Sequence, residues 1–543
     1  MTPSSPISTP TVSAAEPATG ASTPTPTRVL TRVAGELHIA VRENIRTLNP
    51  YAADNDSEAF VVSLLYDTLL EQSPQGNLLP NLAERWEAAC DGMSVSFWLN
   101  SSAKWHDGQP VTAQDVVFSF ELARRHQLPG LVHIVAWVDR VEAVNPSEVK
   151  FALLAPRADA PRLLATQLRI VPAAQWRDVD DPANYGNLEA PVGSGPFLYV
   201  KLVEEEQLVL RNAASHHLFA PSVDTLLVEI LRNEDLALEA LREGQLDALG
   251  WDANPSAVRR VRDEPDEYLG AKWLEAPGET TKVLLLNLRR APYDNAAFRR
   301  ALAQAVDTYM IVQEVAAGFG DAAMGGLFPP ASPWRSTGLV PVPFAALQAV
   351  KDLDAAGFVD RDGDGFREQP DGGPLSVAIT SSDLPDAQSI AEQVAADWGA
   401  VGVSAEVQPI AQNMVVPTLI SATFEVMLTE VSLAEPEMVY FYFHSSRGVL
   451  NHSGVSGLNY GGYVNPELDE LVRLAQVELN SEARQELLDR VQEILAADVP
   501  VIPLYHPCVL GLYRDDHFSG WSAIPGRGIC SRAVLAGLTA SRE

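Results

Sequence analysis

Six residues between Asp360 and Asp371 have the types and the spacing of a calcium-binding loop. The stretch reads DRDGDGFREQPD, which places aspartates at loop positions 1, 3, 5 and 12 and a glutamate at position 9. Such a loop offers a calcium ion carboxylate oxygens and one backbone carbonyl. The pattern predicts a structural calcium held by Asp360, Asp362, Asp364, Phe366 (through its carbonyl), Glu368 and Asp371. A solvated acidic turn is the alternative, because the flanking helices of an EF-hand are not evident.

The histidines and cysteines form no recognisable transition-metal motif. His216 and His217 are the only adjacent histidines, and chain neighbours point in different directions, so a shared metal would need further ligands. No Cys-x-x-Cys pair occurs, which argues against a zinc site. Cys508 and Cys530 either form a disulfide in an oxidising compartment or remain buried thiols, and Cys90 is expected to be a free thiol in a core.

No catalytic motif accompanies these residues. The chain has no G-x-S-x-G nucleophile elbow, no H-E-x-x-H zinc motif and no Gly-Lys-Ser/Thr phosphate loop. Carboxylate pairs are poor evidence for glycoside hydrolysis here, because the chain contains 71 Asp and Glu residues. The prediction is a protein that is not an enzyme, and a secreted hydrolase is the alternative from another class.

The composition limits the classes of partner. The 543 residues include 39 Lys and Arg against 71 Asp and Glu, a net charge of -32, which opposes binding to nucleic acid or to an anionic membrane surface. The length exceeds a single core, so two or three domains are expected. No apolar run reaches the roughly 20 residues of a membrane span. Residues 1–35 are rich in Thr, Ser, Pro and Ala and predict a disordered tether.

The stretch from Trp105 to Phe120 gives the clearest local structure. It reads WHDGQPVTAQDVVFSF, in which Asp107-Gly108 is a turn pair. Thr112 is a good helix N-cap, and Asp115 three residues later completes a capping box. Apolar residues at helical spacing follow, and alternating apolar residues at 95–99 precede the turn. The pattern predicts a strand, a turn and a capped helix.

The same stretch resembles the signature of the family 5 extracellular solute-binding proteins, the receptors of peptide- and nickel-type ABC importers. The family pattern is roughly W-x-D-G-x-P-V-T-A-x-D-V, and this chain keeps each fixed element. Other segments resemble family motifs in the family's order from about residue 36 to the C-terminus: LYDTLL at 65–70, NLLPNLAERW at 77–86, VGSGPF at 192–197, RRAPYDNAAFRRALAQAVD at 289–307 and VIPLY at 501–505.

The resemblance implies an α/β fold with two lobes, of the periplasmic-binding-protein type II, large cluster C kind, with an extra subdomain inserted in the first lobe. The implied boundaries are 36–279 for lobe I, with the inserted subdomain at about 71–190, then 280–504 for lobe II, and 505–543 for a C-terminal return to lobe I. No internal repeat is visible.

The resemblance also implies the function. Such a receptor captures a small solute by closing two lobes around it, and delivers it to a membrane permease driven by a separate ATPase. The expected place is the outer face of the cell membrane or the periplasm, with lipid anchoring through a removed N-terminal segment. The expected protein is a monomer that needs no cofactor, apart from the calcium ion considered above.

The implied ligand residues come from four loops that reach the cleft in peptide-binding relatives. They are Asp54, Asn55, Asp56, Ser57, Trp251, Asp252, Asn254, Glu430, Val431, Glu435, Asn459 and Tyr460, with Tyr505 near the hinge. An ordinary loop or rim position is the alternative for each of them.

One of these loops departs from the family pattern. Relatives often have Gly-Trp there, followed by an Asp that pairs with the peptide's α-ammonium. Here Val431 replaces the Trp, and Glu435 is the nearest candidate for the Asp. Trp251 and Tyr460 are suited to stacking on a sugar, whereas carboxylates such as Asp252 favour a cationic ligand. A di- or oligopeptide is the predicted ligand, and an oligosaccharide or a nickel chelate is the alternative.

Overall fold

The computed structural model describes residues 35–73, 76–219, 221–324, 326–339 and 342–541. All of the predicted tether except Gly35 lies outside the described residues. Within the described part of the chain, no helix has both the length and the apolar character that crossing a membrane requires.

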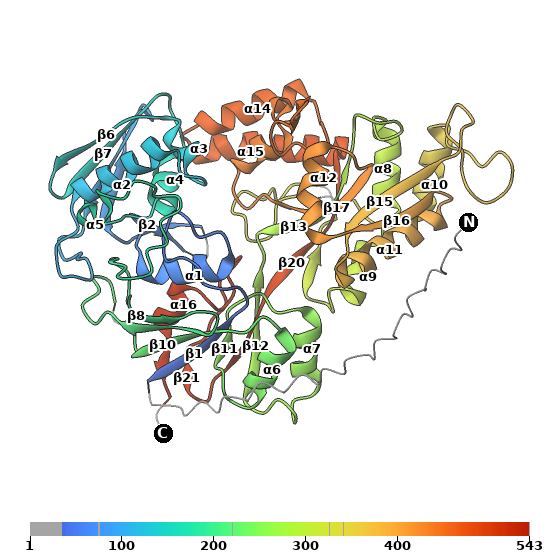
Figure 1. The fold of residues 1–543 in the computed structure, drawn as a ribbon. Helices are drawn as coiled ribbons and strands as arrows, with labels where there is room; N and C mark the ends of the chain where they lie inside the picture. The colour runs from blue at the N-terminus through green and yellow to red at the C-terminus, as the bar shows by residue number, and fades with distance from the viewer. Residues whose placement is uncertain (1–34, 74–75, 220, 325, 340–341, 542–543) are drawn as a thin grey trace, which may run out of the picture. The chain divides into compact units, whose positions relative to one another are not determined.

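A mixed sheet of twelve strands is the largest element of the fold (Figure 1). Its strand order is β16-β15-β17-β13-β20-β11-β1-β10-β9-β8, and β12 and β14 also pair with β20. The strands are β1 (Glu36–Val41), β8 (Phe197–Val203), β9 (Gln207–Asn212), β10 (Thr225–Ile230), β11 (Ala248–Leu249), β12 (Ala271–Pro277), β13 (Thr280–Leu286), β14 (Gly320–Ala322), β15 (Ser376–Ser382), β16 (Ser404–Ile410), β17 (Val426–Ser432) and β20 (Val501–Arg514).

Strand β20 connects the two halves of this sheet. It pairs with β13 and β14 through its first residues, and with β12 and β11 through its later ones. Ile502 and Leu504 belong to one apolar core, whereas Leu510 and Leu512 belong to another. A strand this long is stable because it finds partners on both sides along its length.

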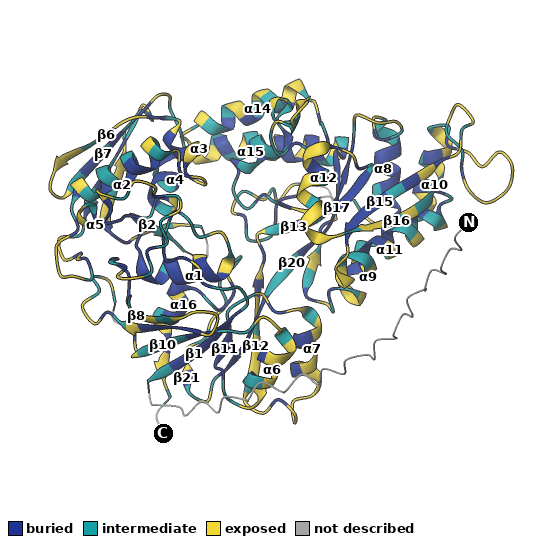
Figure 2. Ribbon diagram, viewed as in Figure 1, coloured by how far each residue is buried: buried dark blue, intermediate teal, exposed yellow. Residues whose placement is uncertain are grey.

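In the described part of the chain, the buried apolar side chains form four clusters, which we assign to two lobes. Lobe I denotes the parts built on the clusters around Leu37 and Leu238, and lobe II those built on the clusters around Leu284 and Val283. Figure 2 shows buried residues along β1 and exposed ones on the outer face of α14 (Pro466–Val477). The residue boundaries given above for the lobes remain a prediction.

Helices flank the sheet in both lobes. Those of lobe I are α1 (Asp56–Leu65), α6 (Glu234–Arg242), α7 (Pro255–Asp263) and α16 (Arg532–Gly537). Those of lobe II are α8 (Ala296–Gln304), α9 (Thr308–Glu314), α10 (Ala346–Ala355), α11 (Pro385–Ala400), α12 (Val415–Ser421), α13 (Met438–Phe443), α14 and α15 (Ser481–Asp498).

A separate antiparallel sheet forms within the N-terminal half, with the order β4-β5-β7-β6. Its strands are β4 (Ala83–Ala88), β5 (Ser94–Leu99), β6 (Val138–Asn145) and β7 (Glu148–Leu153), and the short helices α3 (Val132–Val135), α4 (Ala160–Gln167) and α5 (Ala173–Trp176) accompany it. Helix α2 (Ala113–His126) packs on it through Phe120, whose ring meets that of Phe151 edge to face.

The predicted helix start is confirmed. Helix α2 begins after Thr112, and the reciprocal hydrogen bonds of a capping box join Thr112 and Asp115. The alternation at 95–99 forms β5, whose residues are alternately buried and half-buried. The prediction for Cys90 is wrong, because its side chain is exposed in the loop between β4 and β5 rather than in a core.

The glycines of the VGSGPF segment allow a close approach of two chain segments. A Cβ at Gly193 would lie 1.8 Å from the carbonyl oxygen of Leu65, and one at Gly195 would lie 2.3 Å from that of Leu64. His106 joins the same turn, since its Nδ1 accepts from the N–H of Gly193 at 3.2 Å. These contacts fasten the signature stretch to the end of α1.

Candidate functional site

The main cavity has a volume of about 1490 Å³ and is lined by both lobes. Lobe I contributes residues of α1, of the 250–256 loop and of the 524–533 segment, while lobe II contributes residues of α11, α12 and β17. Ligand sites for drug-sized molecules occupy about 300–1,000 Å³, so this cavity has room for an oligomeric ligand.

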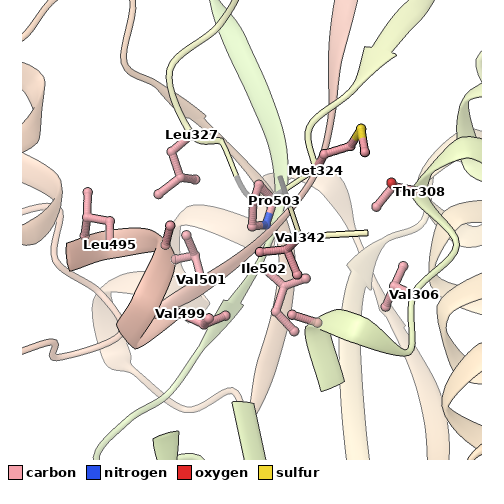
Figure 3. A pocket seen from close by; sticks show the side chains of 12 residues that line it. Val306, Thr308, Met324, Leu327, Val342, Leu495, Val499, Val501, Ile502 and Pro503 are labelled. Carbon is pink, nitrogen blue, oxygen red and sulfur yellow. The ribbon is translucent and has the colours of Figure 1, made fainter. Parts of the chain in front are cut away.

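A second cavity, shown in Figure 3, is too small to be a ligand site. It measures about 20 Å³ and is walled mainly by apolar side chains, among them Val306, Leu327 and Ile502. That space holds about one water molecule. It is therefore a packing gap within lobe II.

Six of the thirteen predicted ligand residues line the main cavity. They are Asp56, Trp251, Asp252, Asn254, Glu430 and Tyr505. They come from the start of α1, the loop after β11, strand β17 and strand β20. The fold thus brings residues that lie as far apart in the sequence as Asp56 and Tyr505 together around one cavity.

The other residues of the first predicted loop point elsewhere. The side chain of Asn55 caps α1 by accepting from the N–H of Glu58 at 2.9 Å. Ser57 is buried and donates to Glu43, and Asp54 forms an exposed ion pair with Arg46 at 2.9 Å. These side chains support the loop, and Asp56 is the residue of this loop that lines the cavity.

Four predicted residues of lobe II also lie outside the cavity lining. Val431 is a core residue because successive residues of β17 face opposite sides. Asn459 is buried and donates to the carbonyl of Tyr463 at 2.8 Å, which fixes the loop that contains Tyr460. Tyr460 is half-buried and packs against a lobe II core.

Glu435, the fourth of these residues, is bound by side chains of lobe I. Arg162 of α4 lies 3.3 Å from one carboxylate oxygen, and Gln72 of β2 (Leu70–Gln72) donates to the other at 3.0 Å. Arg162 also pairs at 2.7 Å with Glu437, which Arg484 of α15 approaches at 3.2 Å. We call these five residues the interlobe ion network.

The two glutamates of the interlobe ion network differ in their pKa values. Burial raises the pKa of Glu435, and Arg162 and Gln72 oppose this effect only in part. Burial also acts on Glu437, but Arg162 and Arg484 outweigh it and hold the pKa of Glu437 below its ordinary value. Glu437 is therefore the charged centre of the network.

A row of polar side chains crosses three adjacent strands at the cavity wall. Lys282 of β13 is opposite Glu430 of β17 on one side and opposite Tyr505 of β20 on the other. Lys282 forms an ion pair with Glu430. The phenol of Tyr505 lines the cavity, although only 5% of this residue is exposed.

Asp252 presents a carboxylate to the cavity. One of its oxygens accepts from the N–H of Leu510 at 2.6 Å, which fixes the loop to β20. Burial by the surrounding atoms, together with the nearby carboxylates of Glu430 and Glu234, raises the pKa of Asp252 to about 6. The field around this residue is negative even though Lys282 is close.

Trp251 is the aromatic residue of the same loop. The guanidinium of Arg42 lies 4.9 Å from the centroid of its ring, and Arg42 pairs with Glu234 at 3.3 Å. The indole N–H of Trp251 is buried and has no hydrogen-bond partner among the described residues. A buried donor without a partner is costly.

Sequence reasoning missed two charged residues of the wall, Glu71 and Arg532. Arg532 begins α16, forms an ion pair with the fully buried Asp67, and lies 2.9 Å from Glu71. Burial disfavours the charge of Asp67, but Arg532 outweighs this effect and lowers the pKa of Asp67. No local motif marks Arg532, because its partners lie more than 300 positions away along the chain.

Cys508 and Cys530 both line the cavity as unpaired thiols, so the disulfide alternative is not found. Burial raises the pKa of Cys508 to about 11 and that of Cys530 to about 12. The thiol of Cys530 donates to the carbonyl of Leu249 at 3.2 Å. Both groups are therefore protonated and weakly nucleophilic at neutral pH.

Among the residues that the structure describes, two groups have the composition of a metal site. Oxygens of Asp360, Asp362 and Glu368 lie within 4.8 Å of one another, as the predicted calcium loop requires. The carboxylates of Asp364 and Asp371 are not part of this group, and all five carboxylates accept from backbone N–H groups. Calcium binding remains a prediction. In the other group, Asp67 with His216 and His217, the guanidinium of Arg532 already supplies the positive charge.

Comparison with known proteins gives a consistent result. Residues 77–449 match the family model described as bacterial extracellular solute-binding proteins, family 5 Middle. A probable di/tripeptide-binding protein 5 of Pseudomonas aeruginosa is 25% identical over 514 residues, which cover 87% of this chain and 90% of that protein.

Solved structures share the fold. A periplasmic oligopeptide-binding protein of Thermotoga maritima is 23% identical, with a TM-score of 0.82 over 93% of this chain and 99% of that one. The same protein with mannohexaose bound gives a TM-score of 0.74 over 95% and 100%. NikZ of Campylobacter jejuni in complex with Ni(L-His) is 22% identical, with a TM-score of 0.76 over 94% and 100%. The predicted two-lobe α/β fold with a separate antiparallel subdomain is confirmed.

Proposed function

Because the chain belongs to the bacterial extracellular solute-binding proteins of family 5, the non-enzymatic receptors of ABC importers, we propose that its ligand is a di- or oligopeptide held in the main cavity. Membership of the family gives the general role: a receptor that lies outside the cytoplasmic membrane and works with an ABC permease. The peptide assignment is our proposal, together with a monomeric state and lipid anchoring.

The single observation that carries the proposal is the cavity itself. Its volume of about 1490 Å³ suits a chain of several residues, and both lobes line it. It offers polar residues such as Asp252, Thr429 and Tyr505 next to apolar residues such as Leu419 and Ile524. A peptide needs this mixture, because its backbone is polar and its side chains vary.

The geometry indicates how capture would work. A ligand that contacts Asp252 in lobe I and Glu430 in lobe II binds only the closed state fully, so it shifts the equilibrium towards closure. Contacts within the protein, such as that of Arg162 with Glu437, also join the two lobes in this structure. No nucleophile or acid/base pair is required, because the ligand is released unchanged.

An oligosaccharide is the second candidate. Trp251 lines the cavity, and an aromatic ring suits packing against a sugar ring. The Thermotoga protein, which has the same fold, was solved with mannohexaose bound. For a nickel chelate such as the Ni(L-His) of NikZ, we find no comparable feature among the residues described.

A thermal-shift screen tests the proposal. Dialysed protein would be heated with di- to pentapeptides, mannohexaose and nickel-histidine, each at about 100 times the dissociation constant, where binding stabilises by about 2.7 kcal/mol. We expect a peptide to raise the melting temperature of the wild type, and to raise it less in Trp251→Ala. A shift with mannohexaose alone would replace peptide by oligosaccharide. Cys90→Ser is a suitable control variant, because Cys90 is exposed and does not line the cavity.

A further inference from the structure

The carboxylate that the family resemblance assigns to a ligand's ammonium group is already occupied. Arg162 and Gln72 bind the two oxygens of Glu435, and this residue is not part of the cavity lining. A ligand ammonium would have to displace a guanidinium that Glu437 also holds at 2.7 Å. Glu435 is therefore poorly placed to receive a cation.

The cavity wall carries carboxylates that the protein leaves without a counter-ion. Among lining cations, Arg42 pairs with Glu234, Lys282 with Glu430, and Arg532 with Asp67 and Glu71. Arg169 and Arg527 also line the cavity, with no ion pair to a described residue, and the charges of Arg527 and Arg532 both act on Arg169. Asp252 and Asp386 both line the cavity and form no ion pair with any residue that the structure describes. Unpaired carboxylates beside an enclosed space favour a cationic ligand.

These carboxylates line the same cavity as one buried tyrosine, Tyr505, which lies opposite Lys282 across the strand pair β13 and β20. Burial, and then the charges of Glu430, Asp386 and Asp252, raise the pKa of Tyr505. Tyr505 is 5% exposed, and its phenol has no hydrogen-bond partner among the described residues although it opens onto the cavity. Four separate elements deliver these groups: the loop after β11, the first turn of α11, β17 and β20.

We propose that Asp252, Asp386, Glu430 and Tyr505, the acidic pocket, bind the cationic end of the ligand in place of Glu435. The inference deepens the proposed function and rests on it. An ammonium group has three donors, and the pocket offers carboxylate oxygens and a phenol oxygen as acceptors. Lys282 neutralises one of the three carboxylates, so the pocket keeps an excess of negative charge that a protonated amine would balance.

Calorimetry with three probes tests this inference: trialanine, N-acetyl-trialanine and mannohexaose. We expect trialanine to bind at least about tenfold more tightly than its acetylated form, because acetylation removes the positive charge. Asp252→Asn and Asp386→Asn should each weaken trialanine binding about tenfold while keeping the side-chain volume. The matched control Asp263→Asn removes an exposed carboxylate of α7 outside the cavity and should leave the affinity unchanged.

Each other outcome overturns a specific statement. If trialanine binds but neither asparagine variant weakens it, or if only Glu435→Gln does, the acidic pocket is wrong and the peptide assignment stands. Equal affinity for the acetylated peptide also refutes the pocket. If mannohexaose alone binds, the receptor binds a neutral ligand, so both the peptide assignment and the pocket are wrong. Binding of none of the probes contradicts both as well.

Discussion

Replacing Arg162 with methionine should lower the free energy of unfolding by about 3 kcal/mol at neutral pH. The side chain of Arg162 is only 17% exposed, and its guanidinium contacts Glu437 at 2.7 Å and Glu435 at 3.3 Å. Removing one partner of a buried ion pair costs about 3–5 kcal/mol, because the other charge stays buried. We expect the lower end of this range, since Arg484 still lies 3.2 Å from Glu437.

Urea denaturation followed by circular dichroism measures this change. The matched control is Arg473→Met, which removes the same atoms from an exposed pair with Glu470 at 2.6 Å. Exposed pairs contribute about 0–1 kcal/mol, so the control should unfold almost like the wild type. Equal shifts for the two variants would refute the interlobe ion network.

The pH dependence gives a second check on the same variant. Arg162 and Arg484 overcome the effect of burial and lower the pKa of Glu437 in the folded protein. A lowered carboxyl pKa adds stability above the unfolded value of about 4.3, and this stability is lost as the pH falls through the folded value. The difference in the free energy of unfolding between the wild type and Arg162→Met should therefore become smaller at acidic pH. If this difference instead became larger at acidic pH, the lowered pKa of Glu437 would be contradicted.

Three further predictions concern the cavity, the turn beneath it and the acidic loop. Affinity for a cationic probe should fall as the pH is lowered through about 6, because Asp252 becomes protonated while Glu430, Glu234 and Lys282 surround it; calorimetry should find a weaker dependence in Asp252→Asn. Gly193→Ala should lower the free energy of unfolding, measured by urea titration, by several kcal/mol, because the new Cβ would clash with the carbonyl oxygen of Leu65. The control Gly399→Ala in α11 places its Cβ in open space and should not lower this free energy. If the 360–371 loop binds calcium, a chelator should lower the melting temperature, and Asp360→Asn should abolish that response; indifference of the wild type to chelator and to added calcium would remove the prediction.

Local features could be predicted because their causes lie within a few residues. The capping box of Thr112 and Asp115 and the alternation of β5 depend on neighbours in sequence, and both are found in the structure. Cys90 shows the limit of such reasoning: it adjoins alanines, yet the loop that contains it faces solvent.

The cavity was only partly predictable, because its residues meet through the tertiary fold. The resemblance pointed to the loops, and five residues from them line the cavity together with Tyr505, but it does not determine which side chain of each loop faces inwards. Glu435 is bound by Arg162 and so does not reach the cavity. Arg162 also binds the neighbouring Glu437, from which it is separated by 275 positions in the sequence. Asp386 was missed because an aspartate in the first turn of a helix is also common as a stabilising charge.

The most direct test of the central claim is recovery of the natural ligand from the cavity. The protein would be purified without refolding and denatured, and the released small molecules would be identified by mass spectrometry. The wild type should release intact peptides that carry a free amino group, and Asp252→Asn should release far less of them. Release of cleaved products with turnover of added peptide, or of neutral oligosaccharides alone, would contradict the account of a peptide receptor with an acidic pocket.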